Sequence, residues 1–171
     1  EWRRRYMFTR AAFSPDGRIV ASGQVDQRNT KNAIAFLDPS TGRPGAVFPA
    51  WPPFACSPDG RYLAARPGHA YEGTAVAVWE VATGKEVLSV GSEGISPRRV
   101  LFSGVGRILA VGGSGEDHNE PISTIECWDV LTGKSVFRVR ASARAVACHA
   151  LSPDGRMLAG VEDEEICLWE T

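Results

Sequence analysis

The sequence predicts an all-β fold built from four repeated antiparallel sheets, and three observations lead to this prediction. A short turn motif occurs four times, an apolar triplet follows each copy, and a longer apolar segment follows each triplet. Repeats of about 40 to 50 residues are typical of arrays in which each unit buries its apolar residues against its neighbours.

The turn motif reads Ser-Pro-Asp-Gly-Arg in the first, second and fourth copies and Ser-Gly-Val-Gly-Arg in the third. The copies occupy residues 14–18, 57–61, 103–107 and 152–156, so their last glycines are 43, 46 and 49 residues apart. Proline presets φ at the second turn position, aspartate can bond its own backbone, and glycine accepts a positive φ. Each copy is therefore predicted to join two strands of a hairpin.

The apolar segments after the turns are predicted to be the second and third strands of each sheet. The triplets are residues 19–21, 62–64, 108–110 and 157–159, and the longer segments are residues 34–38, 76–80, 125–129 and 166–170. In the longer segments the first and third residues are apolar, and the fourth, on the opposite face, is Leu37, Trp79, Trp128 or Trp169. Both faces of these strands are therefore expected to be buried, which requires a neighbouring sheet on each side.

Thr-Gly pairs after the longer segments predict the last turn of the first three sheets. They stand at residues 41–42, 83–84 and 132–133, where glycine supplies the positive φ that a tight turn needs. Residues 87–90 and 136–139 are predicted to be outer strands of the second and third sheets.

The Trp-Asp or Trp-Glu pairs, in phase with the two kinds of turn, resemble the WD-repeat family from Phe8 to the last residue. The resemblance implies a β-propeller of four-stranded antiparallel blades, with about four blades present as part of a larger ring. It places the repeats at about 8–50, 51–96, 97–143 and 144–171. The family's Gly-His dipeptide before the first strand is absent from every copy, and its turn aspartate is matched only by Asp163. We therefore expect the packing to depend mainly on apolar columns.

The composition is that of a soluble globular domain, with 43% hydrophobic residues, 23% charged residues and a net charge of −1. No apolar run approaches the roughly 18 residues of a membrane helix, and the charge balance gives no reason to expect a polyanionic partner. We therefore expect neither a membrane nor a nucleic acid as partner. Only three of the 19 Lys and Arg residues are lysines, which favours a GC-rich bacterial source, and Glu1 as first residue favours a fragment.

The cysteines are Cys56, Cys127, Cys148 and Cys167, which show no CxxC spacing and lie in predicted strands. This pattern favours free, buried thiols over a metal site or a redox motif. No metal and no cofactor are expected. Free thiols fit a reducing compartment, which we take to be the cytoplasm.

No catalytic arrangement is recognisable. His69 and His118 fall in predicted loops and His149 in a predicted first strand, and none has a nucleophile or a carboxylate at a useful spacing. Residues 112–115 (Gly-Gly-Ser-Gly) resemble a phosphate-binding loop only in glycine content, because no helix is expected after them. We interpret them as a flexible loop and expect the chain not to be an enzyme.

The function predicted from the family resemblance is protein–protein interaction or scaffolding. The alternative is a regulatory or substrate-presenting propeller domain of a larger enzyme, such as a kinase or hydrolase, whose catalytic part lies outside this chain. The expected partners are one or more proteins, together with further blades of the parent chain or a second copy that closes the ring.

The candidate binding site follows from differences in repeat length. From the turn glycine to the Trp or Leu column the distances are 20, 19, 22 and 14 residues (17 to 37, 60 to 79, 106 to 128 and 155 to 169). The additional residues, 25–32, 66–73 and 113–123, are predicted to be partner-binding loops on one face of the ring. Tolerated insertion without function is the alternative. The candidate residues are Asp26, Arg28, His69, Tyr71, Glu72, Glu116, Asp117, His118 and Glu120.

Overall fold

The computed structural model of the chain describes residues 7–26, 29–68, 73–91, 94–117, 120–142, 147–162 and 165–171. These residues form fifteen strands in four antiparallel sheets, which confirms the predicted all-β class. We call the sheets blades 1 to 4. None of the described residues belongs to a helix that is long and apolar enough to cross a membrane.

The blades follow one another along the chain. Blade 1 contains β1 (Met7–Phe13), β2 (Ile19–Asp26), β3 (Asn29–Leu37) and β4 (Pro44–Phe48). Blade 2 contains β5 (Ala50–Cys56), β6 (Tyr62–Pro67), β7 (Ala75–Glu80) and β8 (Glu86–Gly91). Blade 3 contains β9 (Ile95–Phe102), β10 (Ile108–Asp117), β11 (Glu120–Asp129) and β12 (Ser135–Ser142). Blade 4 contains β13 (Ala147–Leu151), β14 (Met157–Glu162) and β15 (Glu165–Glu170).

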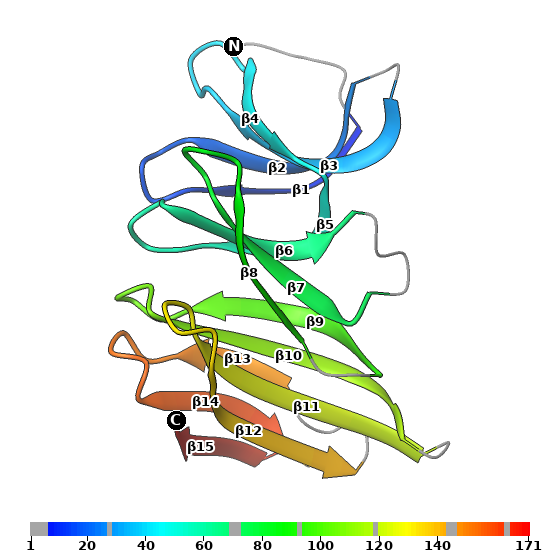
Figure 1. Cartoon of the computed structure of the whole chain (residues 1–171), viewed down its shortest axis with the longest axis vertical. Coiled ribbons are helices and arrows are strands. Elements are labelled where there is room, and N and C mark those ends of the chain that lie inside the picture. The colour runs from blue at the N-terminus through cyan, green and yellow to red at the C-terminus, as the bar shows by residue number, and fades with distance from the viewer. Residues whose placement is uncertain are drawn as a thin grey trace.

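The strands of each blade pair in chain order, and the blades are stacked along the long axis of the molecule (Figure 1). The turns between first and second strands, and those between third and fourth strands, lie along one edge of the stack, which we call the turn face. The strands β2, β6, β10 and β14 run towards the opposite edge, which we call the hairpin face (Figure 1). Each turn motif thus joins the first two strands of a blade, as predicted.

The core lies between blades, as the two-sided apolar pattern predicts. Trp79 is buried against blade 1, where its ring lies 6.0 Å from that of Phe48. Trp128 packs on the cluster between blades 2 and 3, and Trp169 on the cluster between blades 3 and 4. Only Trp79 is fully buried, because the other two indoles keep part of their surface exposed. Burial of each large apolar side chain contributes about 1.5–3 kcal/mol, so these columns dominate the stacking energy.

The register of blade 1 differs by one residue from that of the other blades. Its turn is closed by a bond from the Ser14 amide to the Arg18 carbonyl, whereas the turn of blade 2 is closed between Ser57 and Tyr62. Consequently Ile19 lies opposite Leu37, whereas in blade 2 the residue opposite Trp79 is Leu63. The four apolar triplets therefore do not align residue by residue, because the hairpin turn of blade 1 is one residue shorter than those of the other blades.

The segments predicted to be loops in repeats 1 and 3 are mostly strand. In blade 3 the β10–β11 ladder continues through the pairs Gly113↔Thr124 and Asp117↔Glu120, and in blade 1 the pairing reaches Asp26↔Asn29. The inserted residues extend the hairpin because the antiparallel ladder satisfies their backbone groups. Only repeat 2 leaves this connection partly outside the strands among the described residues, at Gly68 and residues 73–74.

The glycine-rich segment 112–115 is also strand and not a flexible loop. A Cβ added at Gly113 would lie 2.6 Å from the Ser96 carbonyl oxygen, and one at Gly115 would collide with the Gly94 carbonyl oxygen. The glycines therefore let the start of β9 pack directly against the backbone of β10.

The two ends of the stack differ in exposure. Ile166 and Leu168 of β15 are 83% and 66% exposed, whereas the matching Ile125 and Cys127 of β11 are fully buried against blade 4. At the other end, Leu37 is buried on the face of blade 1 that points away from blade 2. The last blade thus presents an uncovered apolar face.

Candidate functional site

The structure describes part of the predicted binding site on the hairpin face. Asp26 stands at the end of β2, and Glu116, Asp117 and Glu120 stand at the ends of β10 and β11. The other predicted candidates lie outside the described residues, as does the expected turn aspartate: Arg28, His69, Tyr71, Glu72, His118 and Asp163.

The longest hairpin on this face belongs to blade 3. Its ladder brings Glu116, Asp117 and Glu120 together, since Glu116 is opposite Pro121 and Asp117 is opposite Glu120. Glu116 and Glu120 are exposed. The strand β9 pairs with β10 only as far as Gly115, so the last two pairs of the β10–β11 ladder extend past β9. Asp26 belongs to blade 1, two blades away, and is not part of this acidic hairpin end.

Charged and polar side chains are buried between blades 2 and 3. Glu126 is 2% exposed and accepts a 2.7 Å hydrogen bond from Arg138 Nη2. Beside it, Trp128 Nε1 is buried and has no hydrogen-bond partner among the described residues. This orphaned donor is consistent with the missing Gly-His dipeptide, since the sequence offers few of the family's internal polar partners.

A small cavity adjoins this cluster. It has a volume of about 10 Å³ and is lined by residues that include Thr74, Thr124, Glu126 and Trp128. Pockets for small-molecule ligands are typically about 300–1,000 Å³, so this cavity is too small for a substrate. At most it has room for one water molecule.

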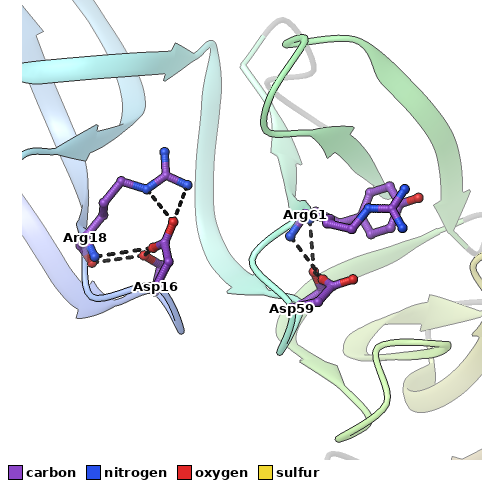
Figure 2. Close-up of polar contacts among 7 residues, drawn as sticks. Asp16, Arg18, Asp59 and Arg61 are labelled. Atoms are coloured by element: carbon purple, nitrogen blue, oxygen red, sulfur yellow. Dashed lines mark hydrogen bonds and ion pairs between the residues drawn. The ribbon is translucent and has the colours of Figure 1, made fainter.

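On the turn face, the turns of blades 1 and 2 each contain an aspartate that accepts several hydrogen bonds (Figure 2). In blade 1, Arg18 Nε and Nη2 lie 2.7 and 2.6 Å from Asp16 Oδ2, and the Ser14 hydroxyl donates to Oδ1 of the same carboxylate. These bonds, that from Arg18 first, lower the pKa of Asp16 to about 2.

Blade 2 closes the same turn without the ion pair. The Asp59 carboxylate accepts from the Ser57 hydroxyl at 2.5 Å and from the Arg61 amide at 3.0 Å. Burial raises the pKa of Asp59, but these hydrogen bonds outweigh burial, so the pKa lies below its usual value. The Arg61 guanidinium instead lies over the Tyr62 ring, 5.5 Å from its centroid (Figure 2).

Blade 3, whose motif lacks the aspartate, uses a different carboxylate. Arg107 Nε donates to Asp129 Oδ2 at 2.8 Å, and Asp129 Oδ1 accepts from the amides of Leu131 and Thr132. Asp129 is the acidic residue of the Trp-Asp pair. Its side chain therefore holds the β11–β12 turn and also serves as partner of the motif arginine, the role that Asp16 has in blade 1. Burial raises the pKa of Asp129, but the bond from Arg107 and the two amide bonds leave it lowered overall.

The altered motif of blade 3 has a steric explanation. A Cβ at Gly104 would lie 2.8 Å from the Cα atom of Pro153 in blade 4, so the proline found in the other copies does not fit there. The Val105 amide donates to the Pro153 carbonyl oxygen at 3.0 Å. The repeat itself gives no reason for this glycine, because the neighbour that favours it, Pro153, stands 49 residues further along the chain.

The described residues contain no cluster of three or more His, Cys, Asp or Glu side chains that could hold a metal ion. The side chains of Cys56 and Cys167 are free thiols. Burial raises the pKa of Cys56 to about 11, which keeps this thiol protonated and unreactive at neutral pH.

Comparison with known proteins agrees with this fold. Residues 133–170 match the WD40 family, described as "WD domain, G-beta repeat". "Centriole proteome protein 16" of Chlamydomonas reinhardtii is 29% identical over 119 residues, which are 68% of this chain and 5% of that protein. In the solved structure of "Kuenenia stuttgartiensis Hydrazine Synthase", 42% of one chain matches 88% of this chain, with a TM-score of 0.67 and 18% identity. That likeness concerns the fold alone.

Proposed function

Because this chain is a stack of four β-propeller blades that carries a WD40 repeat, we propose that it works as a protein-binding or scaffolding module and not as a catalyst. The observation that supports this function most strongly is the β10–β11 hairpin. Its acidic end extends past β9 on a paired two-stranded ladder, and exposed residues that a scaffold of paired strands positions are well suited to recognition.

For blade 3, the predicted binding loop is part of the paired β10–β11 hairpin, with Glu116 and Glu120 exposed. A preorganised element loses less conformational entropy on binding than a free loop of the same length. The acidic charge favours a partner surface that carries Lys or Arg.

The experiment removes the extended part of the hairpin and leaves its sheet intact. Residues 116–121 are replaced by Asn-Gly, which suits a two-residue turn between Gly115 and Ile122, themselves a paired couple. We expect an unchanged unfolding midpoint and loss of partner capture in a pull-down from extract of the source cells. The charge variant E116Q/E120Q, of unchanged length, should weaken capture in the same direction. Capture that survives both changes would refute the proposal.

A further inference from the structure

Two exposed apolar side chains distinguish blade 3 from its sister blades on the turn face. Val105 is 68% exposed, at the motif position where the other copies have Asp16, Asp59 and Asp154. Leu131 is 74% exposed, at the turn position where blades 1 and 2 have Ser40 and Ala82. The equivalent positions of the other blades thus show that the turn can form with polar or small residues. Both side chains are exposed, so contact with the next blade does not require them to be apolar.

A hydrogen bond joins the two turns that contain these residues. The Val130 amide donates to the Arg107 carbonyl oxygen at 2.9 Å, and so joins the turn that contains Leu131 to the turn that contains Val105. The Val105 amide is bonded in turn to the carbonyl of Pro153, which is itself exposed. In Figure 1 the β9–β10, β11–β12 and β13–β14 turns lie next to one another along the turn face.

Two cationic side chains stand on the same turns as Val105 and Leu131. The Arg107 side chain is 61% exposed, and its contact with Asp129 uses Nε, which leaves the terminal amino groups of the guanidinium available for a second carboxylate. Lys134, at the end of the same turn as Leu131, is exposed. A ligand that buries the apolar pair would therefore place its neighbouring groups beside positive charge.

We propose that Val105, Leu131 and Pro153 form a docking surface for a protein segment that presents an apolar side chain next to an aspartate or glutamate. The apolar side chain would cover Val105 and Leu131, and the carboxylate would pair with Arg107 and Lys134. This inference rests on the proposed function, since it assumes that the chain binds proteins. It differs in that the site lies on the turn face and favours an acidic partner, whereas the hairpin favours a basic one.

The test selects peptides from a displayed random library on the intact chain and measures their affinity for variants. V105D/L131S gives blade 3 the residue types of its sister blades, so its thermal unfolding should match that of the unchanged chain. The selected peptides should carry Leu, Ile or Phe beside Asp or Glu, and should bind this variant at least about tenfold more weakly. Their binding should also weaken as salt concentration rises.

A matched pair of charge variants separates the local effect from net charge. Lys134→Glu should weaken binding, whereas Lys85→Glu, at the same position of blade 2, should not. Peptides that ignore V105D/L131S, or a library that yields none, would overturn the docking surface. The Asn-Gly replacement of residues 116–121 tells this failure from that of the proposed function, because it should leave turn-face peptides bound and abolish capture at the hairpin.

Discussion

Gly104 illustrates how a neighbour in space decides a residue that its own repeat does not. Within the repeat, Pro is the residue at this position in the other three copies, and the turn itself would accept it. The backbone of Pro153 in blade 4 comes too close to Gly104 to leave room for a Cβ. Residue identity at such positions therefore follows from the stacking of the blades, which a single repeat does not contain.

Gly104→Pro should destabilise the chain although it restores the motif of the sister repeats. The added Cβ must displace Pro153, and overpacking of this kind costs about 1–3 kcal/mol. A lower urea midpoint checks the prediction, with Val105→Asp one residue away as a control that should leave the midpoint unchanged. Equal midpoints for the two variants would contradict the steric explanation.

Trp128→Phe tests the orphaned indole donor. The substitution removes a buried Nε1–H that has no partner among the described residues, which offsets the loss of ring area. We expect a cost of less than about 1 kcal/mol, against about 3–5 kcal/mol for Trp128→Ala. Denaturant unfolding of both variants provides the comparison, and a costly Phe variant would mean that the indole N–H is satisfied in solution.

The turn carboxylates should make stability depend on pH in the acid range. The pKa of Asp16 is lowered from 3.8 to about 2, chiefly by Arg18, and that of Asp38 from 3.8 to about 2, chiefly by the Ser40 hydroxyl. Their folded-state pKa values lie below the unfolded ones, so their stabilisation is complete above about pH 4 and is lost as pH falls towards 2. D16N/D38N should flatten thermal stability across this window, and an unchanged slope would exclude these two carboxylates as its cause.

Among the secondary-structure elements, the positions of the hairpin turns could be predicted from the sequence, whereas the lengths of the hairpins could not. The Ser-Pro-Asp-Gly and Thr-Gly signals act locally through φ and side-chain bonds. They therefore located the β1–β2 and β3–β4 turns, their equivalents in blades 2 and 3, and the β13–β14 turn. An insertion length, in contrast, does not tell whether the residues form a loop or extend a ladder, and β10 and β11 extend it. The shorter turn of blade 1 was missed because its sequence is the same as that of blade 2.

Gly115→Ala should weaken β10 at the point where β9 begins. The new methyl group would collide with the Gly94 carbonyl oxygen, so the two strands must separate. Amide hydrogen exchange should rise in β9 and the outer half of β10 and remain unchanged in blade 1. Gly84→Ala is the control, because alanine is strained at the positive φ of this position but nothing lies within 4 Å of the added carbon. Equal local exchange in the two variants would count against the close approach.

For the whole molecule, the predicted propeller fold is confirmed, whereas ring size and closure remain predictions. The uncovered face of blade 4 has an energetic consequence, because burial of apolar surface gains about 25 cal/mol per Å². The equivalent faces of blades 1 to 3 are each covered by the next blade. A further blade, from a longer chain or from a second copy, would complete the same contact.

The isolated chain should therefore associate through blade 4. I166E/L168E places charge on two exposed side chains and should convert the associated form to monomer without lowering the unfolding midpoint of the monomer. Sedimentation velocity over a range of concentrations is the measurement. A chain without these substitutions that sediments as a compact monomer at every concentration would disprove association through this face.

The contacts between neighbouring turns also fix the order of the repeats. A Cβ added at Gly106 of blade 3 would lie 3.5 Å from Cδ of Pro58 in blade 2, and Gly104 of the same turn lies against Pro153 of blade 4. A shuffled chain, with blades 2 and 3 exchanged, would set a proline against Pro153 and leave Gly104 opposite a different partner. Blades 2 and 3 are thus not interchangeable, because the turn of blade 3 is adapted to the turn of blade 4 that follows it.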